Sequence, residues 1–291
     1  MRILEKKSLK IRYLHRKAGL TLHVLLTLLP LAAGAVYALL YSVGLAGSLA
    51  AGFTLRYWES LVSRGTLWQT FAYSAYIMGV SIVLSYASAL AMVISARGRL
   101  MERKGSRIFY LPLAMPALVL AFFAFRFLSG GGWLASLAFG SGLIASPQEF
   151  PELVNDPYGL GIIFVHFLLA FAFFSIYLDR VYANERIEEQ VQSAQLLGAG
   201  YRQSLRRVVW PMILRKTWPA ISLYGLFVFG SYEVPLLLGR STPEMLSVRI
   251  VRMLSRFNLN DRPEAFAIVF AYMMLTVLLV FLLRKSKGGL R

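Results

Sequence analysis

Cysteine is absent from the 291-residue chain, which excludes disulfide bridges and thiolate metal sites. The sequence also lacks a Gly-x-x-x-x-Gly-Lys-[Ser/Thr] motif, so it has no phosphate-binding loop of its own. Its three histidines are scattered and do not show the spacing of a zinc site. No Gly-x-Ser-x-Gly nucleophile motif occurs either. We therefore expect that the chain is not an enzyme, has no catalytic residue and binds no metal or cofactor itself.

Charged residues are scarce too, at 15% of the chain, whereas hydrophobic residues make up 57% and aromatic residues 14%. This balance is typical of membrane proteins rather than of soluble domains. The net charge is +17, but the basic residues lie in clusters between apolar runs, as they do beside a lipid bilayer. A nucleic-acid partner would need a soluble basic face instead. We therefore expect the lipid bilayer as a partner, and no nucleic acid.

Six apolar segments are long enough to cross a bilayer, which takes about 20 residues. The sequence thus predicts an all-α, polytopic membrane protein. The first segment follows a basic stretch, as in a signal peptide, but its apolar run exceeds the roughly 7–15 residues of such a peptide, so we expect a retained span. The predicted spans are Leu20–Val43, Leu67–Ile94, Ile108–Leu128, Leu160–Leu178, Trp218–Leu238 and Ala265–Leu283.

Lysine and arginine set the predicted orientation, because they are enriched on the cytoplasmic side. Of the 31 basic residues, 23 lie in the two termini and in two of the five connections, and only seven lie in the other three. Both termini are therefore predicted to be cytoplasmic, as tails of residues 1–19 and 285–291 around a membrane domain of residues 20–284. After the fifth span, the spacing of Arg249, Arg252 and Arg256 predicts an amphipathic surface helix.

The basic cytoplasmic segment between the fourth and fifth spans, residues 180–216, has the pattern of a short helical hairpin. Apolar residues recur with helical spacing from Ile187 to Leu197, and Gly198 then fits a left-handed helix end. A second short helix follows and is predicted to end or kink at Pro211. From the residues alone, this segment is either a compact helix–turn–helix projection or a solvated basic loop.

This segment resembles the EAA loop of permease subunits of binding-protein-dependent ABC importers. The family pattern is Glu-Ala-Ala, three residues, Gly, nine residues and Ile-x-Leu-Pro, and the spacing fits, with Gly198 at the glycine and Val208 to Pro211 at the end. The acidic residue is absent from Gln192-Ser193-Ala194, which puts in doubt any ion pair of the family's glutamate. The residues that the resemblance assigns to ATPase coupling are Gln192, Ser193, Ala194, Leu197, Gly198, Gly200, Arg202, Leu205, Arg206 and Pro211.

Further along, FGSYEVPLLLGRSTPEMLSVRI and LNDRPEAFAI resemble the spermidine/putrescine and iron(III) branch of these permeases. The resemblance implies a six-span, MetI-like permease fold in the bacterial cytoplasmic (inner) membrane, with residues 186–211 as a coupling helix. It implies as partners a second permease, two cytoplasmic ABC ATPases that use ATP-Mg, and an extracytoplasmic substrate-binding protein. The missing acidic residue favours a second permease that is related but not identical. The implied substrate is a small hydrophilic solute of the polyamine, iron(III) or organic-anion kind, with sugars or glycerol phosphates as the alternative.

Polar residues inside the spans are costly in lipid and mark either a substrate path or a structural contact. Arg126 and Glu233 are both predicted toward the outer half, where they form either an ion pair or part of the path. The fifth span also contains glycines and a proline, and broken helices line the paths of transporters. His166, within the fourth span, is either a helix contact or a ligand. The residues predicted to line the path are Arg126, Tyr224, Gly230, Ser231, Tyr232 and Glu233.

Two other classes of function remain open at this point. A self-sufficient secondary transporter would need ion-coupling carboxylates within its spans, and Glu233 is the clear candidate. A membrane scaffold would bind a partner through the basic segment without ATP-dependent transport. Co-purification of an ATPase subunit would distinguish the importer from both.

Overall fold

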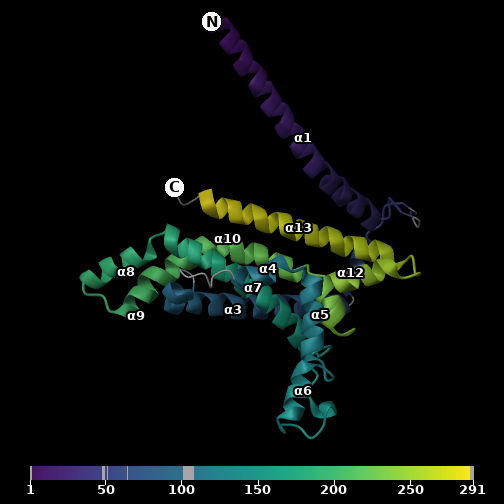
Figure 1. The fold of residues 1–291 in the computed structure, drawn as a ribbon. Helices are drawn as coiled ribbons and strands as arrows, with labels where there is room; N and C mark the ends of the chain where they lie inside the picture. Colours follow the sequence, from purple (N-terminus) through teal and green to yellow (C-terminus); the bar gives the residue numbers. More distant parts are fainter. Residues whose placement is uncertain (1, 48–49, 51, 64, 101–107, 289–291) are drawn as a thin grey trace. The chain divides into compact units, whose positions relative to one another are not determined.

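The computed structural model of the chain describes residues 2–47, 50, 52–63, 65–100 and 108–288. Within these ranges the chain forms helices joined by turns and loops, without a β-strand, which confirms the all-α prediction. The chain divides into two compact units, residues 65–249 and the combination of residues 1–64 with 250–291. Figure 1 shows the helices of both units.

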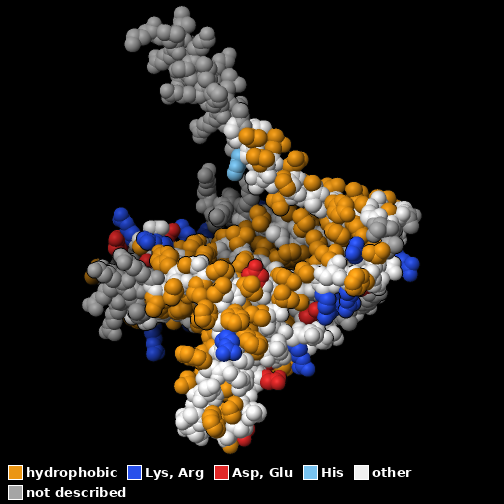
Figure 2. Space-filling model, turned by 45° about the vertical axis from the view of Figure 1, so that its right-hand side comes forward, with side chains coloured by type: hydrophobic (Ala, Val, Ile, Leu, Met, Phe, Trp, Pro, Cys, Tyr) orange, Lys and Arg blue, Asp and Glu red, His pale blue; other side chains and the backbone are white. Residues whose placement is uncertain are grey.

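Five helical segments in the described ranges are long and apolar enough to cross a membrane. Four of them coincide with the predicted first, second, fourth and sixth spans. Hydrophobic side chains are spread widely over the face seen in Figure 2, as expected where helices contact lipid. The five segments are Thr21–Ser42, Leu67–Ser95, Ala117–Gly140, Leu160–Asn184 and Asp261–Leu283.

The third predicted span, residues 108–128, was placed too early in the chain. A short helix, α4 (Leu111–Ala114), ends before Met115, which has an extended backbone with ψ of 137°. The next residue, Pro116, restricts Met115 to this conformation and cannot donate a helical hydrogen bond. The apolar segment that can span the membrane therefore begins with α5 (Ala117–Leu128) and continues through α6 (Trp133–Gly140).

The fifth predicted span, residues 218–238, is two helices rather than one. Helix α10 (Trp210–Phe229) begins earlier than predicted and includes two basic residues, Arg215 and Lys216. It ends before three non-helical residues, and α11 (Glu233–Leu238) follows. This interruption and the basic residues explain why α10 is not among the five long apolar segments. The break lies at Gly230 to Tyr232, within the stretch that the sequence predicts to line the path.

The unit of residues 65–249 is built around two long helices, α3 (Gly65–Leu100) and α7 (Leu160–Asn184). These two helices pack against each other along their length, and α10 packs against both. In Figure 1 the three helices lie side by side, whereas α5 and α6 leave this layer at a steep angle. Phe174 of α7 is fully buried in the core between them. Tyr86 and Thr217 link α3 to α10 through a hydrogen bond of 2.7 Å.

The second unit contains α1 (Arg2–Ser42), α2 (Arg56–Ser63) and α13 (Asp261–Gly288). Helix α1 packs against α13, where the rings of Tyr41 and Phe266 stack at 4.4 Å. Helix α2 is held to α13 by Ser60, whose hydroxyl donates a hydrogen bond of 2.7 Å to Glu264.

The predicted basic surface helix after the fifth span corresponds to α12 (Leu246–Ser255). Arg252 is exposed on it. All three arginines of the predicted strip have interactions within the chain. Arg249 donates a hydrogen bond of 3.3 Å to Thr70. Arg256 lies just beyond the end of the helix and forms an ion pair of 3.4 Å with Asp261. The strip therefore presents less free positive charge than its sequence predicts.

Candidate functional site

The segment of residues 180–216, which is predicted to be cytoplasmic, forms the helix–turn–helix projection expected from its sequence. Helix α8 (Ile187–Leu196) is followed by a turn and by α9 (Tyr201–Ser204). Gly198 in the turn has φ of +89°, a left-handed conformation that glycine adopts without strain. Its N–H donates a hydrogen bond of 2.9 Å to the carbonyl of Gln195, which closes the end of α8. Figure 1 shows α8 and α9 projecting together at one end of the helices α3, α7 and α10.

The sequence predicts that Pro211 either ends or kinks the second helix, and the structure contradicts the first alternative, because the helix does not end there. A π-helical turn, Leu205–Val209, follows α9 and leads directly into α10. Pro211 lies in the first turn of α10, where a residue without an N–H is tolerated. The projection is therefore continuous with the long helix that follows it.

The base of the projection is anchored in the core of the unit. Ile187 and Val209 are almost completely buried among residues of α3, α7 and α10. Glu185, at the end of α7, forms an ion pair of 2.8 Å with Lys216 of α10. The amide of Gln190 also donates a hydrogen bond of 2.8 Å to the carbonyl of Glu185. These contacts fix the orientation of α8 relative to the membrane helices.

The tip of the projection is apolar and uncovered. Leu196 and Leu197 are each 89% exposed, and Tyr201 is 54% exposed. Sequence reasoning named Leu197 but missed Leu196 and Tyr201. Two adjacent leucines directly before a glycine turn could have signalled an apolar tip, because one helical face cannot bury both.

The other coupling residues predicted from the sequence lie around this tip and along the second half of the projection. Ala194 and Leu205 are half-buried. A hollow of about 460 Å³ lies between the second half of the projection and Leu90 and Ile94 of α3. The exposed members of the predicted set are Gln192, Ser193, Leu197, Gly198, Gly200, Arg202, Arg206 and Pro211.

The break between α10 and α11 is held by side chains from two other helices. His166 of α7, which is 1% exposed, lies with its Nε2 atom 2.9 Å from the hydroxyl of Ser231. Ser247 of α12 donates a hydrogen bond to the carbonyl oxygen of Ser231. The alternative that His166 is a helix contact is thus the one that the geometry supports. Gly230 in the break and Glu233 at the start of α11 are exposed, whereas Tyr232 is half-buried.

The other predicted path residues are not brought together as a group. Tyr224 stacks with Phe173 at 4.9 Å and is a packing residue of the helix bundle. Helix α11 packs against α5, so the helices that carry Glu233 and Arg126 are neighbours. Both side chains are exposed, however, and neither belongs to an ion pair in the part of the chain that the structure describes. Their contact with a substrate stays a prediction.

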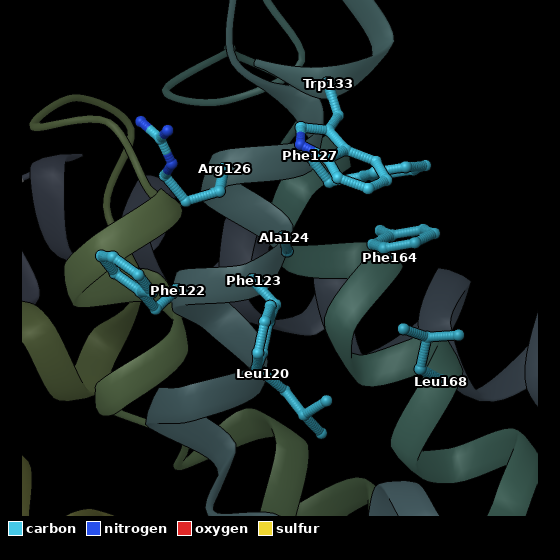
Figure 3. Close-up of a pocket in the computed structure, with 9 residues that line it drawn as sticks. All are labelled: Leu120, Phe122, Phe123, Ala124, Arg126, Phe127, Trp133, Phe164 and Leu168. Carbon is cyan, nitrogen blue, oxygen red and sulfur yellow. The ribbon is translucent and has the colours of Figure 1, made fainter.

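A second hollow, of about 550 Å³, lies between α5 and α7 and opens on one side. In Figure 3 the rings of Phe127, Trp133 and Phe164 gather at one end of it, and the guanidinium of Arg126 points away from them at its edge. The rings of Phe127 and Phe164 stack at 6.4 Å. The full lining is Leu120, Phe122, Phe123, Ala124, Arg126, Phe127, Trp133, Phe164 and Leu168.

Known proteins are similar to this chain in sequence and in fold. The thiamine transport system permease protein ThiP of Brucella abortus (strain 2308) is 30% identical over 271 residues, which cover 91% of this chain and 46% of the relative. The chain thus spans about half the length of this curated relative. A probable ABC transporter permease of Brucella abortus biovar 1 (strain 9-941) is 26% identical over 219 residues, covering 74% of this chain and 73% of that one.

Among solved structures, a bacterial ABC transporter involved in the import of the acidic polysaccharide alginate superposes with a TM-score of 0.68. It is 18% identical and covers 100% of both chains, which shows a shared fold. Residues 87–286 match the family described as binding-protein-dependent transport system inner membrane components. Because this match extends over more than half of the sequence, the chain belongs to that family of ABC importer permeases.

Proposed function

We propose that this chain is one of two permease subunits of an ABC importer, and that residues 186–211 couple it to a cytoplasmic ATPase subunit. The observation that carries this proposal is the pair Leu196 and Leu197, exposed at the tip of a projection whose base is buried. Exposed apolar side chains are unfavourable in water and mark interaction sites when they cluster. A short helix with an apolar tip and a polar rim fits a groove on a partner.

The assembly that follows has ATP-Mg on two ATPase subunits, a second permease that is related but not identical, and an extracytoplasmic substrate-binding protein. Both termini lie on the cytoplasmic side with the projection. The distribution of Lys and Arg supports this orientation, and the family description supports the location in the inner membrane.

The break between α10 and α11 is the proposed path-lining segment, with Glu233 and Tyr232 beside Gly230 and Ser231. Interrupted helices line substrate sites in transporters because their free backbone groups can face a polar cavity. The buried His166 holds this break in place through Ser231. Arg126 lies on α5 at the edge of the aromatic hollow.

The proposed substrate is a small hydrophilic solute. The relative of Brucella abortus is named for thiamine. An organic cation such as thiamine suits an exposed carboxylate such as Glu233. Thiamine and putrescine are therefore the first compounds to assay, followed by glycerol phosphate as the anionic alternative. Uptake of one class and not the other identifies the sign of charge that the path accepts.

A Gly198→Pro substitution tests the coupling role directly. Proline cannot adopt the φ of +89° found at Gly198 and lacks the N–H that bonds to Gln195. We expect an ATPase subunit to co-purify with the wild-type protein from mild detergent and to be lost from the variant. The variant should still be inserted in the membrane, because Gly198 lies in an exposed turn with no side chain within 4 Å of an added Cβ.

The matched control is Gly142→Pro, at an exposed turn distant from the projection in the sequence. Gly142 has φ of +75°, open space around it and an N–H that donates 3.0 Å to the carbonyl of Phe139. This variant should retain the ATPase. If no ATPase co-purifies with folded wild-type protein, the importer proposal fails and ion-coupled transport through Glu233 becomes the next hypothesis.

The contact between His166 and Ser231 should be measurable as a coupling free energy. We expect His166→Phe and Ser231→Ala to be non-additive by about 0.6 kcal/mol and by no more than about 1.7 kcal/mol, the average and the maximum for hydrogen bonds between membrane helices. Unfolding of the single and double variants in mixed micelles gives this value. The control pair is His166→Phe with Ser95→Ala, because Ser95 bonds to the carbonyl of Ala91 in its own helix. Additivity in both pairs would show that the break is held by other contacts.

A further inference from the structure

The hollow between α5 and α7 has the size of a ligand site but almost no polar lining. Its volume of about 550 Å³ falls within the range of roughly 300–1,000 Å³ found for small-molecule sites. Except for Arg126 and the indole of Trp133, its lining side chains are phenylalanine, leucine and alanine. A hydrophilic solute would lose its hydration there without replacement hydrogen bonds. The chemistry of the hollow therefore suits a hydrocarbon chain.

The hollow also lies where hydrocarbon chains are present. Helices α5 and α6 form one of the apolar segments that can cross the membrane, and α7 forms another. Phe122 and Phe123 are 57% and 58% exposed, and Trp133 is 72% exposed. In a bilayer such side chains contact acyl chains, and tryptophan is enriched at the level of the headgroups. Trp133 lies with Phe127 and Phe164 at one end of the hollow and adds an aromatic surface there.

Arg126 supplies a full positive charge at the edge of the hollow. It lies in the last turn of α5, is exposed, and belongs to no ion pair within the described part of the chain. Arginine in a span is costly unless it reaches the interface or meets an anion. Its planar guanidinium matches two oxygens of a phosphate. In Figure 3 this group points away from the phenylalanine rings, as a headgroup contact requires.

We propose that the hollow binds one phospholipid with an anionic headgroup, such as phosphatidylglycerol. The acyl chain packs against Phe123, Phe127 and Phe164, and the phosphate accepts hydrogen bonds from Arg126. The complementary charge favours this occupant over an apolar helix of a second permease, which would bring no anion to the guanidinium. The inference depends on the membrane location of the chain, not on the identity of the transported solute.

Native mass spectrometry of the purified protein, titrated separately with phosphatidylglycerol and phosphatidylcholine, tests this assignment. We expect the wild type to bind phosphatidylglycerol at least several-fold more tightly. Arg126→Gln should remove that preference while still binding both lipids. Phe123→Ser should instead weaken both lipids equally, because it alters the acyl-chain contact alone. Arg240→Gln, at an arginine exposed outside the hollow, is the matched control and should keep the preference.

An unchanged lipid preference in Arg126→Gln would overturn the proposal, as would Phe123→Ser binding both lipids as wild type does. The wild type could instead be purely dimeric and bind neither lipid, while Phe123→Ser disrupts the dimer and restores lipid binding. That result would assign the hollow to a contact with a second permease. Both substituted side chains are exposed, so the variants should fold, and elution as a single symmetric peak outside the void volume on size exclusion checks this. The ATPase co-purification of the Gly198 experiment is independent of all these outcomes.

Discussion

Replacing Leu196 and Leu197 together by aspartate is expected to abolish ATP-driven uptake. Each leucine contributes about 1.5–3 kcal/mol when it is buried by a partner, and 1.4 kcal/mol corresponds to a tenfold change in affinity. Loss of both contacts should weaken ATPase binding at least about 100-fold, before any repulsion by the new charges. The folded chain should tolerate the change, because both side chains are 89% exposed.

Titration of the ATPase subunit onto purified permease measures the affinity, and ATPase activity in proteoliposomes measures the coupling. Leu143→Asp is the matched control, since Leu143 is 80% exposed but lies in a connection on the opposite predicted side. It should leave both quantities unchanged. Wild-type affinity in the double variant would mean that the tip does not enter the partner, whatever the family resemblance implies.

Gly159→Val is expected to cause the largest loss of folding stability. Gly159 precedes α7 with φ of +66°, and a Cβ atom there would lie 2.4 Å from Ile77 and 2.6 Å from the hydroxyl of Tyr73. The left-handed conformation costs about 1–3 kcal/mol for a residue with a side chain. Overpacking against α3 adds about 1–3 kcal/mol. The free energy of unfolding should therefore fall by about 2–6 kcal/mol.

Thermal unfolding in detergent measures this loss against Gly79→Val, a helical glycine of α3 with open space around it. The control should change stability by less than about 1 kcal/mol, because valine differs from glycine there mainly by its somewhat more favourable helix propensity. Equal midpoints for the two variants would show that α3 and α7 can separate at this point without cost. Because α7 also carries His166, a shift of its N-terminal end should disturb the break in the fifth span as well.

Much of the fold could be predicted because lipid imposes a strong local pattern. A run of about 20 apolar residues identifies a span whatever it packs against, and four spans were located in this way. The conformation of Gly198 could also be predicted, since a glycine at the end of an apolar helical stripe predicts a left-handed turn. The third span was misplaced because hydropathy does not register that Pro116 forces Met115 out of the helix.

The candidate sites were less predictable because they depend on contacts between distant segments. His166 and Ser231 are far apart in the sequence, and no local pattern joins a histidine in one span to a serine in the next. The aromatic hollow likewise needs α5 to lie against α7, so that Phe127 meets Phe164. Arg126 illustrates the limit well. Its position inside a predicted span indicated a path or contact role, but the direction of its side chain depends on how α5 packs.

The uninterrupted passage from the π-helical turn into α10 has a mechanical consequence. Helix α10 has 20 residues and is about 30 Å long. A force on the tip at Leu197 would therefore be transmitted along a nearly rigid helix. Two contacts restrain sideways motion of α10. They are the ion pair of Lys216 with Glu185 and the hydrogen bond of Thr217 with Tyr86. Helix α10 ends before Gly230, and the three non-helical residues that begin there form a hinge. If a partner displaces the tip, the motion would reach α11 through a pivot at these residues, which His166 holds in place through Ser231.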